Sequence, residues 1–453
     1  MLHVVDRSGD SSATATCGHT AHGRTDGLHR RSLLKVGFLG LGGLSLPQIL
    51  ALRQQAGAQT TTRQTSVIYL ELAGGPSQFE TYDPKPEAPR EYRGSFGAIP
   101  TTLPGIYFCD LMPQQSQILD KLAIVRSVRH PHNSHDPSSH MVQSGYYKTG
   151  PKGGPNQFPC IGSTVAKLRG TNAIGVPAYA AIPKVMRNGR AAFLGNSCDP
   201  FEVGGDPNEP DFQVKNLVLE QGLSLERIRN RRSLLTSLDD ARRVVDHQGV
   251  ASSMDRFTAE ALELVTGDRA REAFDLSRED EKTRELYGRH TWGQGFLLAR
   301  RLVEAGVTFV TVRVPGWDDH TKIDPSMERK GPPYDQALTA LVNDLYQRGL
   351  DRDVLVVSIG EFGRTPRINT KAGRDHWGAL MSVLFSGGGL KVGQVIGASN
   401  SKGEVPIEAE YHPNHVLATV YRHLGIDPGM TITDFSGRPH HLLQKTSVIK
   451  ELV

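Results

Sequence analysis

Apolar runs alternate along the chain with longer stretches in which apolar residues recur at helical spacing. The runs are rich in Val, Ile and Leu and lack a regular polar alternation, as strands buried on both faces do; they lie at 66–72, 122–128, 307–314, 353–360 and within 378–389. Helical spacing is clearest at 291–306, 333–349 and 413–425. This alternation predicts an α/β fold with a mostly parallel central sheet and helices on both faces.

The domain organisation follows from the same pattern. Residues 59–453 contain no Pro- or Ser-rich linker between two separate apolar regions, so we expect a single domain. Residues from about 211 to 286 are highly charged, contain few glycines and have helical spacing. We expect them to form a helical insertion that covers part of the sheet.

The N-terminal segment has the features of an export signal. Arg30 and Arg31 precede an apolar stretch at 36–46, and the small residues at 56–58 offer an A-x-A cleavage site. The apolar stretch is about 11 residues long and is too short for a transmembrane helix. We expect residues 1–58 to be a twin-arginine signal peptide that directs the mature chain to the periplasm or outside the cell, with no transmembrane segment. An uncleaved amphipathic anchor is the alternative.

Charge and cysteine content narrow the possible functions. The chain has 52 basic and 48 acidic residues, and this net charge of +4 is too small to indicate a nucleic-acid partner. No C-x-x-C pair occurs, which argues against a structural zinc site of that kind. Of the four cysteines, Cys109, Cys160 and Cys198 lie in the mature chain, and we expect them to be buried free thiols.

Four polar segments follow or lie next to the expected strands. They read "GGPSQFETYDPK", "HPHNSHDPSSH", "GWDDHTKID" and "GEFGRTPRINTKAGRDHWGA". In open α/β sheets, ligands bind beyond the carboxyl ends of the strands. We therefore expect these segments to form one site, with candidate residues Ser77, His135, His140, Asp318, His320, Glu361, Arg364, Asp375 and His376.

The chemistry of these side chains favours a divalent metal. Carboxylates and imidazoles together suit Zn²⁺, or Mn²⁺ and Fe²⁺ where oxygen ligands dominate, and Ca²⁺ and Mg²⁺ are the other candidates. Such an ion would polarise a phosphoryl or sulfuryl oxygen. The alternatives are that Asp318 and Asp319 cap the next helix, and that Asp375 and His376 form a turn with a surface imidazole.

Three further expectations concern residues around this site. Arg364 suits a tetrahedral oxyanion, or it pairs with Glu361 to fix the loop. The prolines of "HPHNSHDPSSH" should prevent a regular helix across it, and we expect His135 and His140 to line the site as ligands or proton carriers. Trp317 and Trp377 should pack in the core.

The polar motifs together resemble a known family. A twin-arginine leader followed by "AGGPSQFETYDPKP", "LDKLAIVRSV", "GWDDH", "GEFGRTP" and "GRDHW" is similar to the planctomycete-type bacterial domain-of-unknown-function family 1501. The resemblance runs from about Val67 to the C-terminus. That family is grouped with the alkaline phosphatase-like superfamily, which includes sulfatases, so the resemblance implies the same sheet and a site at the strand ends.

The resemblance implies roles for individual residues. Asp318 and His320 match a metal-binding pair, and His376 matches a final metal-binding histidine. Glu361 stands where the superfamily has a metal-binding Asp, whereas Phe362 replaces the histidine that follows it. Asp375 would orient the neighbouring groups or add a ligand.

The start of the site departs further from the superfamily pattern. Glu71 is the residue nearest to the metal-binding Asp that ends the first strand of the superfamily. Ser77 is nearest to the nucleophile position, and the sulfatase motif Cys/Ser-x-Pro-x-Arg is missing.

Two functions are compatible with these features. The first is an exported, metal-dependent hydrolase of phosphate or sulfate esters, acting on a small molecule or a glycan. The second is a catalytically degenerate alkaline phosphatase-like scaffold of the cell envelope that binds a glycan or a partner. Bound metal and turnover of esters would distinguish the first from the second.

Overall fold

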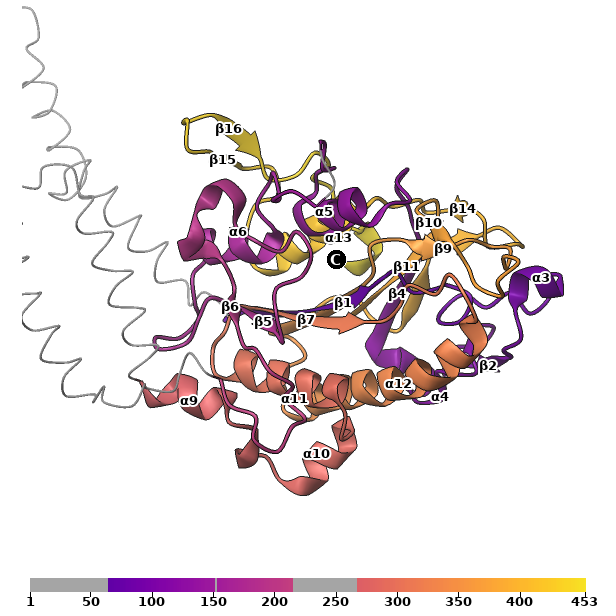
Figure 1. The fold of residues 1–453 in the computed structure, drawn as a ribbon, viewed down its shortest axis with the longest axis horizontal. Helices are drawn as coiled ribbons and strands as arrows, with labels where there is room; N and C mark the ends of the chain where they lie inside the picture. The colour runs from indigo at the N-terminus through magenta and orange to yellow at the C-terminus, as the bar shows by residue number, and fades with distance from the viewer. Residues whose placement is uncertain (1–63, 151–152, 215–266) are drawn as a thin grey trace, which may run out of the picture. The chain divides into compact units, whose positions relative to one another are not determined.

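The computed structural model describes residues 64–150, 153–214 and 267–453, and these residues contain an eight-stranded sheet (Figure 1). The strand order is β12-β4-β11-β8-β1-β7-β5-β6. Neighbouring strands are parallel except β11, which is antiparallel to both β4 and β8. The predicted α/β fold with a mostly parallel sheet is confirmed. The strands are β1 Ser66–Ala73, β4 Leu122–Val128, β5 Tyr179–Ile182, β6 Phe201–Glu202, β7 Phe309–Pro315, β8 Val354–Ile359, β11 Met381–Gly387 and β12 Gln394–Ile396.

Helices cover both faces of the sheet. One layer contains α4, α9, α10, α11 and α12, and the other contains α5, α6 and α13 (Figure 1). The helices are α3 Arg90–Arg93, α4 Pro113–Ser116, α5 His135–Ser144, α6 Ile161–Leu168, α9 Asp268–Phe274, α10 Glu281–Tyr287, α11 Thr291–Glu304, α12 Ile323–Gln347 and α13 Pro413–His423. Short two-stranded sheets complete the described part: β2 Ala98–Pro100 with β3 Tyr107–Cys109, β9 Gly363–Arg364 with β10 His376–Trp377, β13 Ala398–Ser399 with β14 Pro406–Glu408, and β15 Thr431–Thr433 with β16 Pro439–His441.

The central strand β1 explains why the strand sequences are continuously apolar. Ile68 and Leu70 face the core that contains α11 and α12, whereas Val67 and Tyr69 face the core that contains α6 and α13. Successive side chains of a strand point to opposite faces, so a sheet covered on both sides buries every position.

The topology brings the four polar segments to one edge. Strands β1, β4, β7 and β8 all end at this edge because they point in the same direction. Strand β11 runs the opposite way, so the residues that precede it also start from this edge. The β9–β10 ladder lies here and pairs His376 with Arg364.

Two helices differ from the sequence prediction. Helix α12 begins at Ile323, ten residues before the predicted start, and contains Pro332 and Pro333. Its first turns are held because Ile323 and Met327 are buried in the core, and such packing outweighs local helix propensity. The histidine segment was predicted to be irregular, but α5 begins within it.

Three other predictions concern the cysteines, the segments outside the core of the fold and membrane-spanning helices. Cys109, Cys160 and Cys198 are buried free thiols, as predicted. The predicted signal peptide and residues 215–266 of the predicted helical insertion lie outside the described residues, whereas α9 and α10 form helices at the end of that predicted segment. No helix of the described residues is long and apolar enough to span a membrane.

Candidate metal centre

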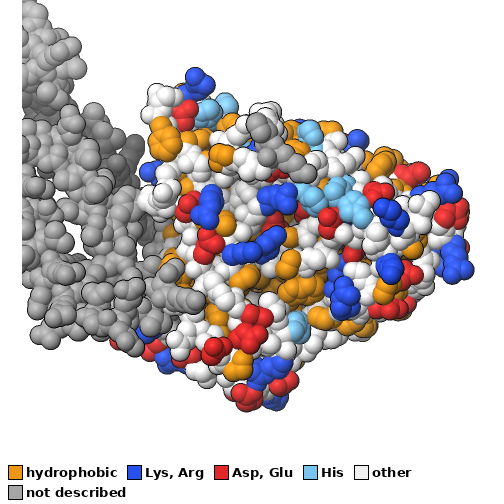
Figure 2. All heavy atoms as spheres, in the orientation of Figure 1, with side chains coloured by type: hydrophobic (Ala, Val, Ile, Leu, Met, Phe, Trp, Pro, Cys, Tyr) orange, Lys and Arg blue, Asp and Glu red, His pale blue; other side chains and the backbone are white. Residues whose placement is uncertain are grey.

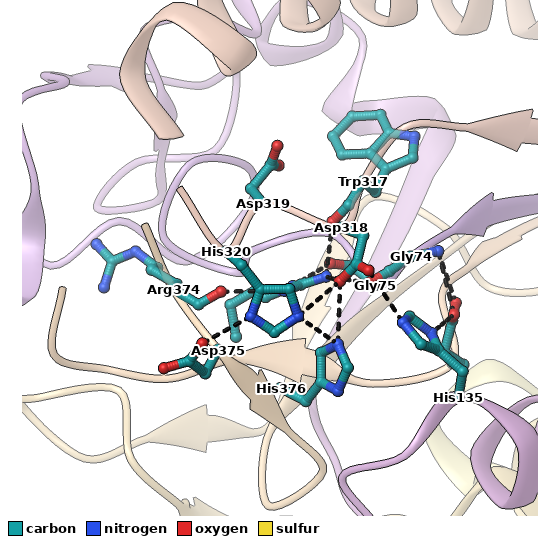
Figure 3. A network of polar contacts seen from close by, with 12 residues as sticks. Gly74, Gly75, His135, Trp317, Asp318, Asp319, His320, Arg374, Asp375 and His376 are labelled. Carbon is teal, nitrogen blue, oxygen red and sulfur yellow. Dashed lines mark hydrogen bonds and ion pairs between the residues drawn. The ribbon is translucent and has the colours of Figure 1, made fainter. Parts of the chain in front are cut away.

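Three histidines surround the carboxylate of Asp318 at the carboxyl edge of the sheet (Figure 3). Asp318 and His320 follow β7, His376 begins β10, and His135 begins α5. The Nε2 atoms of His376 and His320 lie 3.0 and 3.1 Å from Asp318 Oδ1, and His135 Nε2 lies 3.1 Å from Asp318 Oδ2. The structure therefore brings together residues from three of the predicted segments.

The hydrogen-bond partner of the Nδ1 atom fixes the tautomer of each histidine. His135 Nδ1 lies 2.7 Å from Glu361 Oε1, and His320 Nδ1 lies 2.6 Å from Asp375 Oδ1. His376 Nδ1 lies 2.9 Å from the carbonyl oxygen of Asn133. An ionised carboxylate and a carbonyl only accept hydrogen bonds, so each Nδ1 carries the proton and donates it. In the neutral rings, each Nε2 consequently presents a lone pair toward Asp318.

This arrangement fits a cation. The Nε2 atoms of His320 and His376 are only 2.9 Å apart, and two lone pairs at this distance repel unless a proton or metal lies between them. Tetrahedral zinc with Zn–N bonds of about 2.0–2.1 Å would separate its ligand atoms by roughly 3.3 Å. His135, Asp318 and His376 each offer a ligand atom within 4.8 Å of the others. The donor set therefore suits Zn²⁺ or a similar borderline ion.

Glu361 and Asp375, which were predicted to bind metal, stand behind the histidines as hydrogen-bond acceptors. Histidines that bind metals commonly donate their second N–H to a carboxylate or carbonyl group, which fixes the ring. Glu361 is itself held by the backbone N–H of Gly74, at 3.1 Å from Oε1 and 3.0 Å from Oε2. Glu361 and Asp375 therefore orient the rings of His135 and His320.

The charges of the cluster depend on these contacts. Burial opposes ionisation of Asp318, but the hydrogen bond and the positive charge of the Arg364 guanidinium outweigh it and hold the pKa of this carboxyl well below its usual value. The hydrogen bond to Glu361 raises the pKa of His135. Burial lowers the pKa of His376. Asp318 thus stays anionic and His376 favours the neutral form that binds metals.

Arg364 does not face an open oxyanion site, which corrects its predicted role. Its side chain is fully buried, and it does not pair with Glu361. Instead, Arg364 Nη2 donates a hydrogen bond of 2.6 Å to Asp318 Oδ1. The guanidinium also donates hydrogen bonds to the main-chain carbonyls of Gly74, Gly75, Trp317 and Arg374. Arg364 therefore ties three loops together and orients Asp318.

The glycines after β1 allow these loops to approach each other. A Cβ atom on Gly74 would lie 2.5 Å from the backbone nitrogen of Asp318, and one on Gly75 would lie 2.6 Å from Phe362. Both glycines have positive φ angles, of 117° and 83°, which side chains disfavour. The "AGGPS" motif is therefore needed for the close packing of the site.

Ser77, the predicted nucleophile, is not brought to the cluster. Its side chain is 1% exposed, and its Oγ accepts a hydrogen bond of 3.3 Å from the backbone N–H of Phe79. Within the described residues, no hydroxyl or thiol is hydrogen-bonded to His135, Asp318 or the other two histidines.

His140 also lies away from the cluster. Pro137 fits the first turn of α5, where its missing N–H has no helical partner, so the helix starts at His135 despite the proline. Five helical residues separate the two histidines by about 140° around the axis, which turns them in different directions. His140 is fully buried, with Nδ1 2.6 Å from the carbonyl of Tyr146 and Nε2 accepting from the N–H of Gln157 at 3.1 Å. It stabilises a loop.

A buried carboxylate lies close to Glu361. Glu71, near the end of β1, is 4% exposed, and burial together with the charge of Glu361 raises its pKa to about 8. Its Oε2 has no hydrogen-bond partner, and Arg313 Nε lies 3.8 Å away. His130 Nε2 holds the backbone carbonyl of Glu361 at 2.7 Å. A histidine contact to a main-chain carbonyl, such as that of His130 with Glu361 or that of His376 with Asn133, cannot be predicted from the residue types.

Solved structures with a similar chain path include phosphatases and sulfatases. An alkaline phosphatase from the Antarctic bacterium TAB5 is 11% identical, with 81% of this chain and 99% of that chain covered and a TM-score of 0.36. The PsFucS1 sulfatase from Pseudoalteromonas sp. is 12% identical, with 83% and 70% covered and a TM-score of 0.38. The lipoteichoic acid synthase LtaP from Listeria monocytogenes is 10% identical, with 86% and 89% covered and a TM-score of 0.34.

Sequence comparison gives a more direct assignment. No curated protein matches the chain. The family model described as "Protein of unknown function (DUF1501)" matches residues 64–453, which include every strand of the sheet and all residues of the cluster. The chain therefore belongs to the DUF1501 family, as its motifs indicated.

Proposed function

We propose that this protein is an exported, metal-dependent hydrolase of phosphate or sulfate esters. The observation that carries the proposal is the convergence of three imidazole Nε2 atoms on one ionised carboxylate, that of Asp318. Export rests on the twin-arginine pattern at Arg30 and Arg31.

The residues that would hold the ion are His135, Asp318, His320 and His376. A divalent ion bound there would act as a Lewis acid on an ester oxygen and lower the pKa of a bound water. Zn²⁺ suits the three nitrogens and one carboxylate, and Mn²⁺, Mg²⁺ and Ca²⁺ are the other candidates.

The chain itself would supply orientation and charge. Glu361 and Asp375 hold the outer N–H groups of His135 and His320, so neither ring can turn away. Arg364 fixes the Asp318 carboxylate. Figure 2 shows histidine side chains gathered on one face, with both basic and acidic side chains around them.

The nucleophile in this proposal is water. Ser77 is buried and its hydroxyl is engaged by the backbone of Phe79, so it has no path to a substrate. Solvent reaches the cluster because the Asp318 side chain is 43% exposed and that of His320 is 41% exposed. Direct hydrolysis therefore requires no covalent intermediate on the protein.

A binding or scaffold role is the second candidate. Phe362 is fully buried against the ring of His376, with 4.3 Å between the centroids, where the superfamily pattern would have a second metal-binding histidine. A cluster with fewer metal ligands than an enzyme of this superfamily needs would still bind an ester but would not hydrolyse it.

Metal analysis and a substrate screen would test the proposal. The purified chain would be analysed by elemental mass spectrometry and assayed with aryl phosphates, phosphodiesters and aryl sulfates in the presence of Zn²⁺, Mn²⁺, Mg²⁺ or Ca²⁺. We expect about one bound ion, and loss of both ion and turnover in His320→Ala and His376→Ala.

The matched control is His441→Ala, because His441 is exposed on β16 and belongs to no contact of the cluster. Absence of bound metal in the native chain, or equal turnover by His320→Ala, would contradict the enzyme. Bound metal without turnover of any ester, combined with ester binding, would favour the scaffold.

A further inference from the structure

A cleft opens directly beside the histidine cluster. It has a volume of about 520 Å³ and is lined by residues that include Tyr92, Arg367, Asp375, Trp377 and Glu404. This volume lies within the range of roughly 300–1,000 Å³ that small-molecule sites have. Asp375 belongs to both places, because its Oδ1 holds His320 while its side chain lines the cleft.

A buried arginine fixes the walls of the cleft. Arg374 is fully buried and pairs with Glu80, at 2.8 Å between Nη2 and Oε1. Its guanidinium also donates to the backbone carbonyls of three residues that line the cleft, Tyr92 at 2.6 Å, Thr365 at 3.2 Å and Pro366 at 2.5 Å. Burial of an ion pair is costly, and a pair satisfied in this way holds the surrounding loops in one geometry. The cleft is therefore preformed.

Two aromatic side chains and an arginine side chain define the chemistry of the cleft. The indole N–H of Trp377 donates to the carbonyl of Glu404 at 2.7 Å, which fixes the ring in the cleft wall. Lys402 Nζ lies 5.2 Å from the ring centre of Tyr92 and steadies it. Arg367 is exposed, and no other described residue forms a hydrogen bond or ion pair with its guanidinium.

We propose that this cleft binds the alcohol portion of the ester and that this portion is a sugar ring. The faces of Tyr92 and Trp377 offer flat apolar surface for the C–H groups of a sugar, and Asp375 and Glu404 offer acceptors for its hydroxyl groups. Arg367 faces a second anionic substituent of the sugar. This inference rests on the proposed function for the reaction and adds the class of substrate.

The polar wall distinguishes a sugar from a simple aryl group. An aryl group would stack on Tyr92 and Trp377 equally well, but it would offer no donor to the second oxygen of the Asp375 and Glu404 carboxylates. The first oxygen of each already accepts a hydrogen bond, from His320 and Asn400. Polar groups that lose water without a new partner weaken binding. A ring-free alkyl group would leave both the aromatic and the polar wall unused.

Ligand binding by the full chain with Zn²⁺ added would test the inference. Saturation-transfer NMR would compare glucose 6-sulfate and glucose 6-phosphate with phenyl sulfate and methyl sulfate. We expect the sugar esters to bind more tightly than both others. Tyr92→Ala should weaken the binding of glucose 6-sulfate about three- to tenfold, while Tyr92→Phe retains it. Arg367→Gln should abolish any preference for glucose 3,6-disulfate over glucose 6-sulfate.

The variants leave the fold in place, since Arg374 uses only the backbone carbonyl of Tyr92. Phe435→Ala is the control, because Phe435 is 81% exposed on the β15–β16 turn and does not line the cleft. Tighter binding of phenyl sulfate, or unchanged binding in Tyr92→Ala, would overturn the sugar site. Sugar binding that depends on Tyr92 without turnover would support the cleft and contradict the hydrolase. Turnover of glucose 6-phosphate at the same rate and KM in Tyr92→Ala as in the native chain would support the hydrolase and contradict the cleft.

Discussion

Replacement of Arg364 by Met should destabilise the protein and loosen its metal site at the same time. The guanidinium is fully buried and donates to five acceptors, the carbonyls of Gly74, Gly75, Trp317 and Arg374 and the Asp318 carboxylate. Methionine fills a similar space but donates nothing. The substitution therefore leaves buried acceptors without partners at the point where three loops meet.

The expected loss can be estimated from these contacts. A buried acceptor that loses its donor costs about 1–3 kcal/mol. This cost applies to the buried main-chain carbonyls, whereas the Asp318 side chain is 43% exposed and can bind water instead. Some of the acceptors would relax toward water, so we expect the free energy of unfolding to fall by about 4 kcal/mol. Asp318 would also lose its strongest donor, which should weaken metal binding at least about tenfold.

Urea unfolding followed by circular dichroism would measure the stability, and titration with Zn²⁺ would measure the affinity. Arg367→Met is a matched control from the same loop, because the exposed Arg367 side chain has no partner among the described residues. We expect this control to change stability by less than about 0.5 kcal/mol. A loss below about 1 kcal/mol for Arg364→Met would refute the role assigned to Arg364.

Three further variants test separate parts of the site. Ser77→Ala should leave hydrolysis within about twofold of the native rate, because the hydroxyl is buried away from the cluster; a complete loss of turnover would restore Ser77 as the nucleophile. His140→Ala should lower the free energy of unfolding by about 2–3 kcal/mol through the loop N–H groups that it leaves unpaired, with the metal content unchanged by elemental analysis. Glu71→Gln should remove the part of the pH dependence of the free energy of unfolding that the Glu71 carboxyl causes. The pKa of Glu71 is raised to about 8 in the folded protein, above its ordinary value of about 4.3, so native stability should fall as pH rises through this window, at about 1.4 kcal/mol per pKa unit. Urea unfolding in a chelator at pH 5, 7 and 9 would show this decline in the native chain and a flatter profile in the variant.

The order of elements could be read from the sequence because it is written in local patterns. Strands such as β1 and β8 are continuous apolar runs, and α11 has clear helical spacing, so each was located before its neighbours were known. Helix α12 was predicted from residue 333, ten residues after its true start at Ile323. Burial of Ile323 and Met327, which decides the true start, depends on contacts with distant parts of the chain.

The edge of the sheet at which the site forms could also be predicted from the sequence, because parallel strands with polar residues at their carboxyl ends define one edge. The residue types alone indicated a metal, and Asp318, His320 and His376 were correctly grouped at this edge. What each residue does there was less accessible. Arg364 and Ser77 looked like reactive groups in the sequence, yet both are buried and fully engaged.

The sequence by itself determined five of the eight strands of the sheet, the edge that carries the chemistry and the kinds of donor gathered there, because these depend on local periodicity and strand direction. The short strands β5, β6 and β12 were not predicted. Only the tertiary structure decided which donors converge. His135 and His140 are five residues apart, and the turn of α5 sends one to Asp318 and the other into a loop. The ladder between β9 and β10 sets His376 against His320, and the buried Arg374 shapes a cleft beside them. Distances of a few ångströms between segments far apart in the chain decide these roles, and no local pattern records them.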